Sequence, residues 1–155
     1  MSAKTDFQAN FGKMGGQVGA ASGVQELAGH VWDAKGGNLE LVTANVTLTA
    51  ADHGKTFLCA TDGVVFTLPA TASGLKFTFI NTGADGAVGI SISPAAADAI
   101  HGTTNASTNV VLSGTDDKDA INTKGTATTG DNMTILGDGS VGWYVVGCHG
   151  IWASE

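Results

Sequence analysis

The chain contains no arginine, and its seven lysines are scattered through 155 residues whose formal net charge is −7. Proteins that bind nucleic acids need clustered lysine and arginine to displace the counterions of the phosphate backbone. Anionic membrane surfaces attract basic segments in the same way. The lack of positive charge therefore argues against nucleic acids and membranes as partners of this protein.

Charge of either sign is also scarce. Only 14% of the residues are charged, compared with roughly 25% in typical soluble domains, so solubility must come from threonine, serine, asparagine and exposed backbone. There are two prolines and 23 glycines. This composition favours β-structure with many turns over helices that are joined by surface ion pairs. The length is enough for one ordinary domain with a core of its own.

Long apolar runs are missing as well. No apolar run in the sequence is long enough to span a bilayer. The N-terminal sequence MSAKTDFQANFGKMGGQVG does not contain the continuous apolar core of a secretory signal. We therefore expect the protein to be made in a cytoplasm.

Cysteine is limited to Cys59 and Cys148, which lie far apart in the sequence. In a reducing compartment two buried thiols are expected, because free cysteine is among the most buried residue types. Cys148 precedes His149, but a catalytic thiol needs a base within hydrogen-bonding reach, and neighbouring residues on a strand point to opposite faces. We therefore favour a structural role for Cys148. The distant histidines that could pair with it instead are His30, His53 and His101.

Sequence motifs for metal binding are equally weak. The histidines and cysteines show neither H-x-x-x-H nor C-x-x-C spacing. The sequence GTDDKDAIN gathers Asp116, Asp117 and Asp119, whose oxygens could hold Ca²⁺. Lys118 interrupts them and the spacing is not that of an EF-hand, so a solvated acidic loop is the simpler interpretation. We predict no catalytic residue, no metal site and no cofactor, and hence a structural or adhesive protein rather than an enzyme.

Residues 1–37 differ from the remainder of the chain. Their first part is rich in glycine, alanine and glutamine without a sustained period, which indicates an irregular N-terminal arm. In SGVQELAGHVW, apolar residues then recur at helical spacing, and Ser22 is placed to cap a helix. A short helix over 23–33 is therefore expected, although Gly23 and Gly29 weaken it.

From Leu39 onward the period changes to two, which predicts a β-domain over residues 38–155. Short apolar runs are separated by glycine, aspartate and asparagine turns, as in sandwiches and barrels. The turn 61–63 contains Asp-Gly and predicts a hairpin between KTFLCA and GVVFTLPA. We expect an all-β fold, a compact antiparallel sandwich or barrel. No strict internal repeat is visible, so a solenoid is not expected.

Three stretches carry a resemblance to a known class of domain. They are VTLTAADHGKTFLCATDGVVFTLPA, GLKFTFINTGADGAVGISISPAAADAIHG and the terminal MTILGDGSVGWYVVGCHGIWA. Their order and motifs resemble a β-rich domain of tailed-bacteriophage virion proteins, over roughly residues 45–153. The size and layout are most similar to a head decoration protein, also called a capsid cement protein.

The resemblance implies a structural virion protein. It would be made in the host cytoplasm and would bind the outer surface of the mature head as a homotrimer. Its partner would be the lattice of the major capsid protein, which it would stabilise by mass action. A tail-fibre or host-glycan-binding adhesin module is the alternative.

Two groups of contact residues are predicted for this role. Apolar anchors of the arm would contact the capsid; they are Phe7, Phe11 and Met14. Aromatic residues near the C-terminus would either close the core or form a subunit interface, depending on which strand face is buried; they are Trp143, Tyr144 and Trp152. In the adhesin alternative the same aromatic residues would bind sugar.

Overall fold

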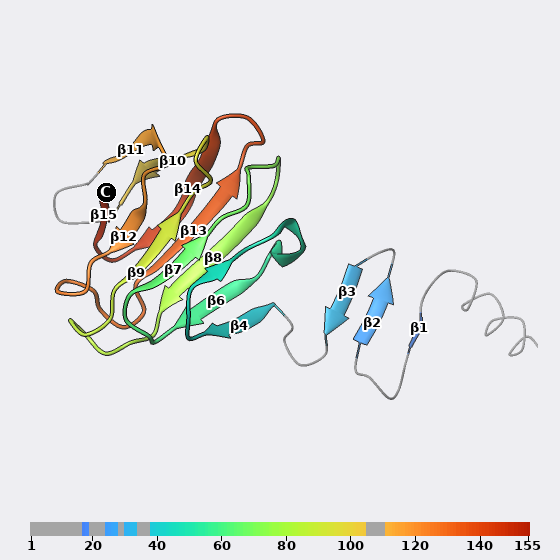
Figure 1. Cartoon of the computed structure of the whole chain (residues 1–155). Coiled ribbons are helices and arrows are strands. Elements are labelled where there is room, and N and C mark those ends of the chain that lie inside the picture. The colour runs from blue at the N-terminus through green and yellow to red at the C-terminus, as the bar shows by residue number, and fades with distance from the viewer. Residues whose placement is uncertain (1–16, 19–23, 28–29, 34–37, 105–110) are drawn as a thin grey trace, which may run out of the picture. The chain divides into compact units, whose positions relative to one another are not determined.

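The computed structural model describes residues 17–18, 24–27, 30–33, 38–104 and 111–155 (Figure 1). It divides into two units, Met1–Asn38 and Leu39–Glu155. The only helix among the described residues is the single 3-10 turn η1 (Ala50–Asp52). The predicted all-β class is therefore confirmed.

The described residues of the first unit form a small antiparallel sheet. Its strands are β1 (Gln17–Val18), β2 (Val24–Leu27) and β3 (His30–Asp33), in the order β1-β2-β3. The helix predicted over 23–33 is wrong, because β2 and β3 occupy this segment with Leu27 opposite His30. Glycine disfavours a helix by roughly 1 kcal/mol per residue, and the segment holds two, Gly23 and Gly29.

The second unit is a sandwich of two packed sheets (Figure 1). The seven-stranded sheet has the order β11-β10-β14-β13-β8-β6-β4, and the five-stranded sheet has the order β15-β12-β9-β7-β5. The strands of the first are β4 (Leu39–Val42), β6 (Thr56–Cys59), β8 (Lys76–Asn81), β10 (Ala99–Thr103), β11 (Val111–Asp116), β13 (Asn132–Gly137) and β14 (Gly142–His149). The strands of the second are β5 (Val46–Thr47), β7 (Val64–Thr67), β9 (Ile90–Ser93), β12 (Ala120–Asn122) and β15 (Trp152–Ser154).

The first half of this unit is built from arches. From β4 to β9 the chain alternates between the two sheets, so that β4, β6 and β8 pair in parallel in one sheet and β5, β7 and β9 pair in parallel in the other. The hairpin predicted at 61–63 is therefore wrong, since β6 and β7 belong to different sheets. The sandwich is also mixed rather than purely antiparallel.

The three arches repeat in space without repeating in sequence. Leu39 pairs with Thr56, and Thr56 pairs with Thr78, so the spacing along the chain is uneven. Because the sequence has no regular repeat, it gave no indication of these stacked arches. Parallel pairing in register needs only matching alternation along each strand, because alternate side chains face the same side.

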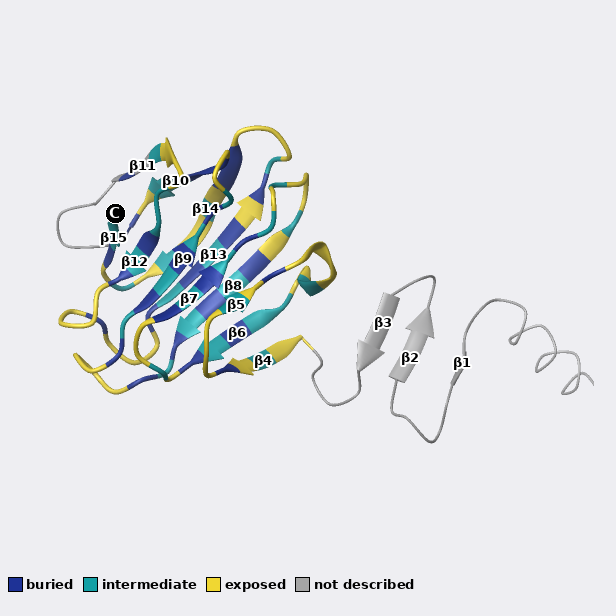
Figure 2. Cartoon of the chain, viewed as in Figure 1, coloured by how far each residue is buried: buried dark blue, intermediate teal, exposed yellow. Residues whose placement is uncertain are grey.

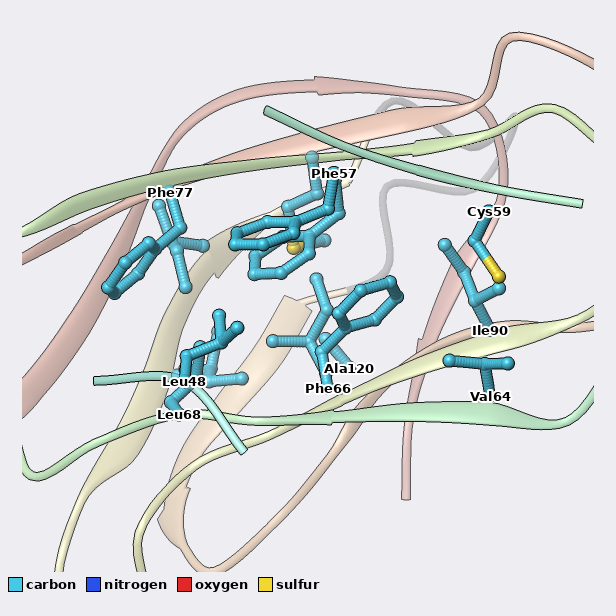
Figure 3. Close-up of a cluster of buried hydrophobic side chains, with 14 of the residues drawn as sticks. Leu48, Phe57, Cys59, Val64, Phe66, Leu68, Phe77, Ile90 and Ala120 are labelled. Carbon is cyan, nitrogen blue, oxygen red and sulfur yellow. The ribbon is translucent and has the colours of Figure 1, made fainter. Parts of the chain in front are cut away.

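Aromatic rings from both sheets fill the centre of the sandwich (Figure 3). Phe57 and Phe79 stack at a centroid distance of 5.6 Å on neighbouring strands, and Phe66 of the opposite sheet lies 4.9 Å from Phe79 and 5.8 Å from Phe57. All three rings are fully buried. Burial alternates along β8 and β13, as Figure 2 shows, so each strand presents one face to this core.

The sandwich is closed on the side opposite β4 and β5. There β11 contacts β15, and the Thr104 hydroxyl donates to the carbonyl of Trp152 at 3.3 Å. At the other side β4 and β5 are the last strands of their sheets. The unit therefore has one side where the two sheets meet and one side with two edge strands.

Candidate binding surface

The two thiols lie in the interior or at its margin. Cys59 is fully buried, and burial raises the pKa of its thiol although its Sγ donates to the carbonyl of Thr61. Cys148 is partly buried and packs against the core, whereas its neighbour His149 is exposed. The two neighbours therefore point to opposite sides of the strand, as the sequence predicted.

A bulge in β14 changes which of its residues share a face. Thr134 of β13 pairs with Gly147 and Ile135 pairs with Val145, so Val146 is an extra residue. Uninterrupted alternation along the strand would place Cys148 on the same face as Tyr144 and Val146. Beyond the bulge the alternation reverses, and Cys148 faces inward beside Met133.

The acidic loop after β11 is held by groups of its own chain. Burial raises the pKa of Asp119, while a hydrogen bond with Ser93 acts in the opposite direction. Lys118 lies 3.7 Å from the carboxylate of Glu155. Within the described ranges no three histidine, cysteine or acidic side chains converge as metal ligands would.

The most extensive buried polar cluster ties the two sheets together. Asn81 of β8 donates to the side-chain oxygen of Asn122 on β12 at 2.7 Å, and Asn122 donates to the carboxylate of Asp131 at 2.8 Å. The backbone N–H and the hydroxyl of Thr128 both donate to Asp131. Since these groups satisfy one another, the cluster stabilises the fold and offers no group to a ligand.

The three aromatic residues that were predicted to close the core or to form an interface differ in exposure. Trp143 and Trp152 are 0% exposed and belong to the core. Tyr144 is 43% exposed and stacks on His101 at a ring distance of 5.0 Å. The anchors predicted in the arm lie outside the described residues; they are Phe7, Phe11 and Met14.

Tyr144 belongs to the outer face of the seven-stranded sheet. The register places side chains in rows across this face. One row is Leu41, Leu58, Ile80, Asn132 and His149. The next is Leu39, Thr56, Thr78, Thr134 and Gly147. A third is Lys76, Leu136, Tyr144 and His101.

Two apolar patches emerge from these rows. The first patch is Leu39, Leu41, Leu58 and Ile80, on β4, β6 and β8. The second patch is Leu136, Tyr144 and Val146, on β13 and β14. A threonine strip separates them, with the hydroxyls of Thr78 and Thr134 hydrogen-bonded at 3.0 Å.

Most side chains of these patches are unusually exposed for their type, whereas Leu58 and Ile80 are half-buried. Leu41 is 69% exposed, Leu39 59% and Val146 56%. A surface of this kind on a small protein commonly marks a site of interaction with another protein. The outer face of the five-stranded sheet differs, because its outward residues are small or half-buried, such as Thr67, Ser91 and Ser93.

Acidic side chains are absent from the outer face of the part of the seven-stranded sheet that carries the two patches. The strands β4, β6, β8, β13 and β14 contain one acidic residue, Glu40. Glu40 is in register with the buried Phe57, and its carboxylate accepts a hydrogen bond from the ammonium of Lys55 at 2.8 Å. Hydrogen bonds to Asp52 and Glu40 raise the pKa of Lys55. The protein's negative charge therefore lies mainly in turns and loops.

Sequence reasoning found Tyr144 but missed the leucines and Val146. A signal was present, because LELV and LKFTFIN have apolar residues at positions of both parities. In a two-layer sandwich one parity faces solvent, so such strands must expose apolar side chains.

Comparison with protein-family models finds no match to this chain, and a search of curated proteins finds no relative. Among the described residues there is no helix of the length and hydropathy needed to cross a membrane.

Proposed function

We propose that this protein is a structural virion protein of a tailed bacteriophage that decorates the outer surface of the mature head and stabilises it. It acts by binding rather than by catalysis. Its partners are the lattice of the major capsid protein and further copies of itself, in a homotrimer. The protein is made in the host cytoplasm and resides in the virion.

The observation that carries this proposal is the apolar outer face of β4, β6, β8, β13 and β14, on which no outward side chain is acidic. Such a face suits contact with folded protein surfaces, where aromatic and aliphatic side chains form the centre of the interface. The motifs from Asp52 to Lys55 and from Asp138 to Tyr144 supply the resemblance to virion domains. Binding only to the assembled lattice would stabilise that lattice by mass action.

The adhesin alternative has lost much of its support. Its sugar platform was to be built from Trp143, Tyr144 and Trp152, but both tryptophans are buried. Tyr144 would have to act without them, already stacked on His101. A glycan array would test this alternative directly.

Co-sedimentation with phage heads tests the proposal. Purified full-length protein is mixed with expanded heads that lack it and, as the control, with unexpanded procapsids. We expect binding to the heads, little binding to the procapsids, and greater resistance of the decorated heads to dissociation. Failure to sediment with any shell, or antibody labelling of tails in intact particles, would contradict the proposal.

A further inference from the structure

The two apolar patches on the outer face of the seven-stranded sheet need a partner that covers them. We infer that this face is the surface through which copies of this chain pack against one another, with the first patch of one copy on the second patch of the next. This inference deepens the proposed function and rests on the assembly of several copies that it includes.

The charge distribution favours a second copy as the occupant. In a chain with a net charge of −7, two copies repel each other wherever their acidic groups meet. On this face no outward position of β4, β6, β8, β13 or β14 is acidic, and Lys76 is the one lysine. Two such faces can therefore meet without bringing carboxylates together.

The five-stranded sheet does not offer the same opportunity. Asp62 lies in the turn that precedes β7, where its carboxylate pairs with Lys124. Asp119 lies beside β12, and its backbone carbonyl accepts a hydrogen bond from Glu155 after β15. The outward side chains of that sheet are also small or half-buried, such as Thr67, Ser91 and Ser93, so it offers less exposed apolar surface to a second copy.

The size of the face also fits an association of copies. The five strands β4, β6, β8, β13 and β14, spaced about 4.8 Å apart and each about six residues long at 3.3 Å per residue, cover about 480 Å² in projection. A standard protein interface buries about 800 Å² per partner. The face is therefore of the right order for an interface of modest stability.

The arrangement of the two patches indicates how the copies meet. The first patch lies on β4, β6 and β8, and the second lies on the adjoining strands β13 and β14, with the threonine strip between them. One face can therefore present both a first and a second patch to its neighbours. Contact between unlike patches closes either as a symmetric pair or as a ring. The Tyr144 ring, held by its stack on His101, would supply the aromatic anchor that interfaces favour.

Charge substitutions on each patch test the inference. Leu41→Lys and Leu136→Glu place a charge in the first and second patch, at positions that are exposed in the single chain and should not disturb folding. We expect the wild-type protein to sediment as an oligomer. Each variant should associate roughly a hundredfold more weakly, because its charge would be buried without a partner.

Matched controls separate this effect from a general effect of charge. Val65→Lys and Ile121→Glu introduce the same charges on the outer face of the five-stranded sheet, and these variants should remain oligomeric. The double variant Leu41→Lys/Leu136→Glu should recover association, because each contact between unlike patches would then pair a lysine with a glutamate. Circular dichroism and thermal unfolding verify that every variant is folded.

The outcomes distinguish this inference from the proposed function. A monomeric wild-type protein, or face variants that stay oligomeric, would overturn the inference. A double variant that stays monomeric would overturn the contact between unlike patches. If the wild type is monomeric and Leu41→Lys abolishes co-sedimentation with heads, the face belongs to the shell contact and the proposed function stands without this inference.

Discussion

Two buried tryptophans in the last part of the chain occupy different hydrogen-bonding environments. The indole N–H of Trp152 donates to the carbonyl of His149 at 3.1 Å. The indole N–H of Trp143 is buried against Phe77 and has no hydrogen-bond partner among the described residues. An unpaired buried donor costs about 1–3 kcal/mol. The large Trp143 ring therefore fills the core but leaves a buried N–H group without a hydrogen bond.

Phenylalanine in place of each tryptophan should reveal this difference. Trp143→Phe removes the unpaired donor, whereas Trp152→Phe removes a donor and leaves the carbonyl of His149 without it. Both variants lose similar volume, so we expect Trp143→Phe to be the more stable by about 1–3 kcal/mol. Urea unfolding at neutral pH measures the two free energies. Equal losses of stability would show that the Trp143 N–H is satisfied in solution.

Sequence reasoning at the residue scale identified Trp143, Tyr144 and Trp152 as a group but could not divide them. Alternation along β14 separates Trp143 from Tyr144, but it does not say which face of the sheet is covered. That depends on the opposite sheet, which residues elsewhere in the chain supply. The bulge at Val146 then reverses the alternation for Cys148. No local sequence pattern predicted this bulge.

The turn between β13 and β14 depends on a single carboxylate. Asp138 accepts hydrogen bonds from the backbone N–H groups of Ser140, Val141 and Gly142 at 2.8–3.0 Å. These bonds, with that of Gly142 the largest contribution, hold the pKa of Asp138 below its usual range. The side chain of Asp138 thus holds this turn together, and Gly139 supplies a positive φ of 78°.

Acid should weaken this turn. Because the pKa of Asp138 is lower in the folded state than in the unfolded state, its contribution to stability is present above the unfolded value of about 3.9 and is lost as pH falls through the folded value. Asp138→Ala should lower the unfolding midpoint by a few degrees at neutral pH and by less at pH 2–3. Asp138→Asn keeps an acceptor oxygen and serves as the control without a titrating group. A pH-independent loss in Asp138→Ala would contradict this role for the charge.

At the scale of the whole molecule, the unit Leu39–Glu155 contains its own core. Among the described residues, the members of the main hydrophobic cluster lie between Val42 and Trp152. The phenylalanines of the stacked arches and the Asn81–Asn122 bridge both join the two sheets within this unit. The described residues of this unit therefore supply a core that joins its two sheets, and we expect the unit to fold independently of the first.

Removal of residues 1–37 should separate folding from assembly. We expect the truncated chain to unfold in one cooperative transition, with a midpoint within about 4 °C of the full chain, which corresponds to at most about 1 kcal/mol. Binding to expanded heads should weaken more than stability, because the predicted contacts Phe7, Phe11 and Met14 are removed. Differential scanning calorimetry and co-sedimentation measure the two effects. A truncated chain that is unfolded would contradict the independence of the second unit.

The sequence by itself determined that this protein is all-β, where most of its strands lie and which side chains along each strand alternate. These properties depend on composition, turn residues and a period of two, all of which are local. It could not determine that β6 joins β8 while β7 joins β9, because alternation is the same in a hairpin and in an arch. Only the tertiary structure decided this, through the packing of Phe57 and Phe79 against Phe66 across the core. The same packing left Leu39, Leu41 and Tyr144 on the outside, since a sandwich of two sheets covers only one face of each.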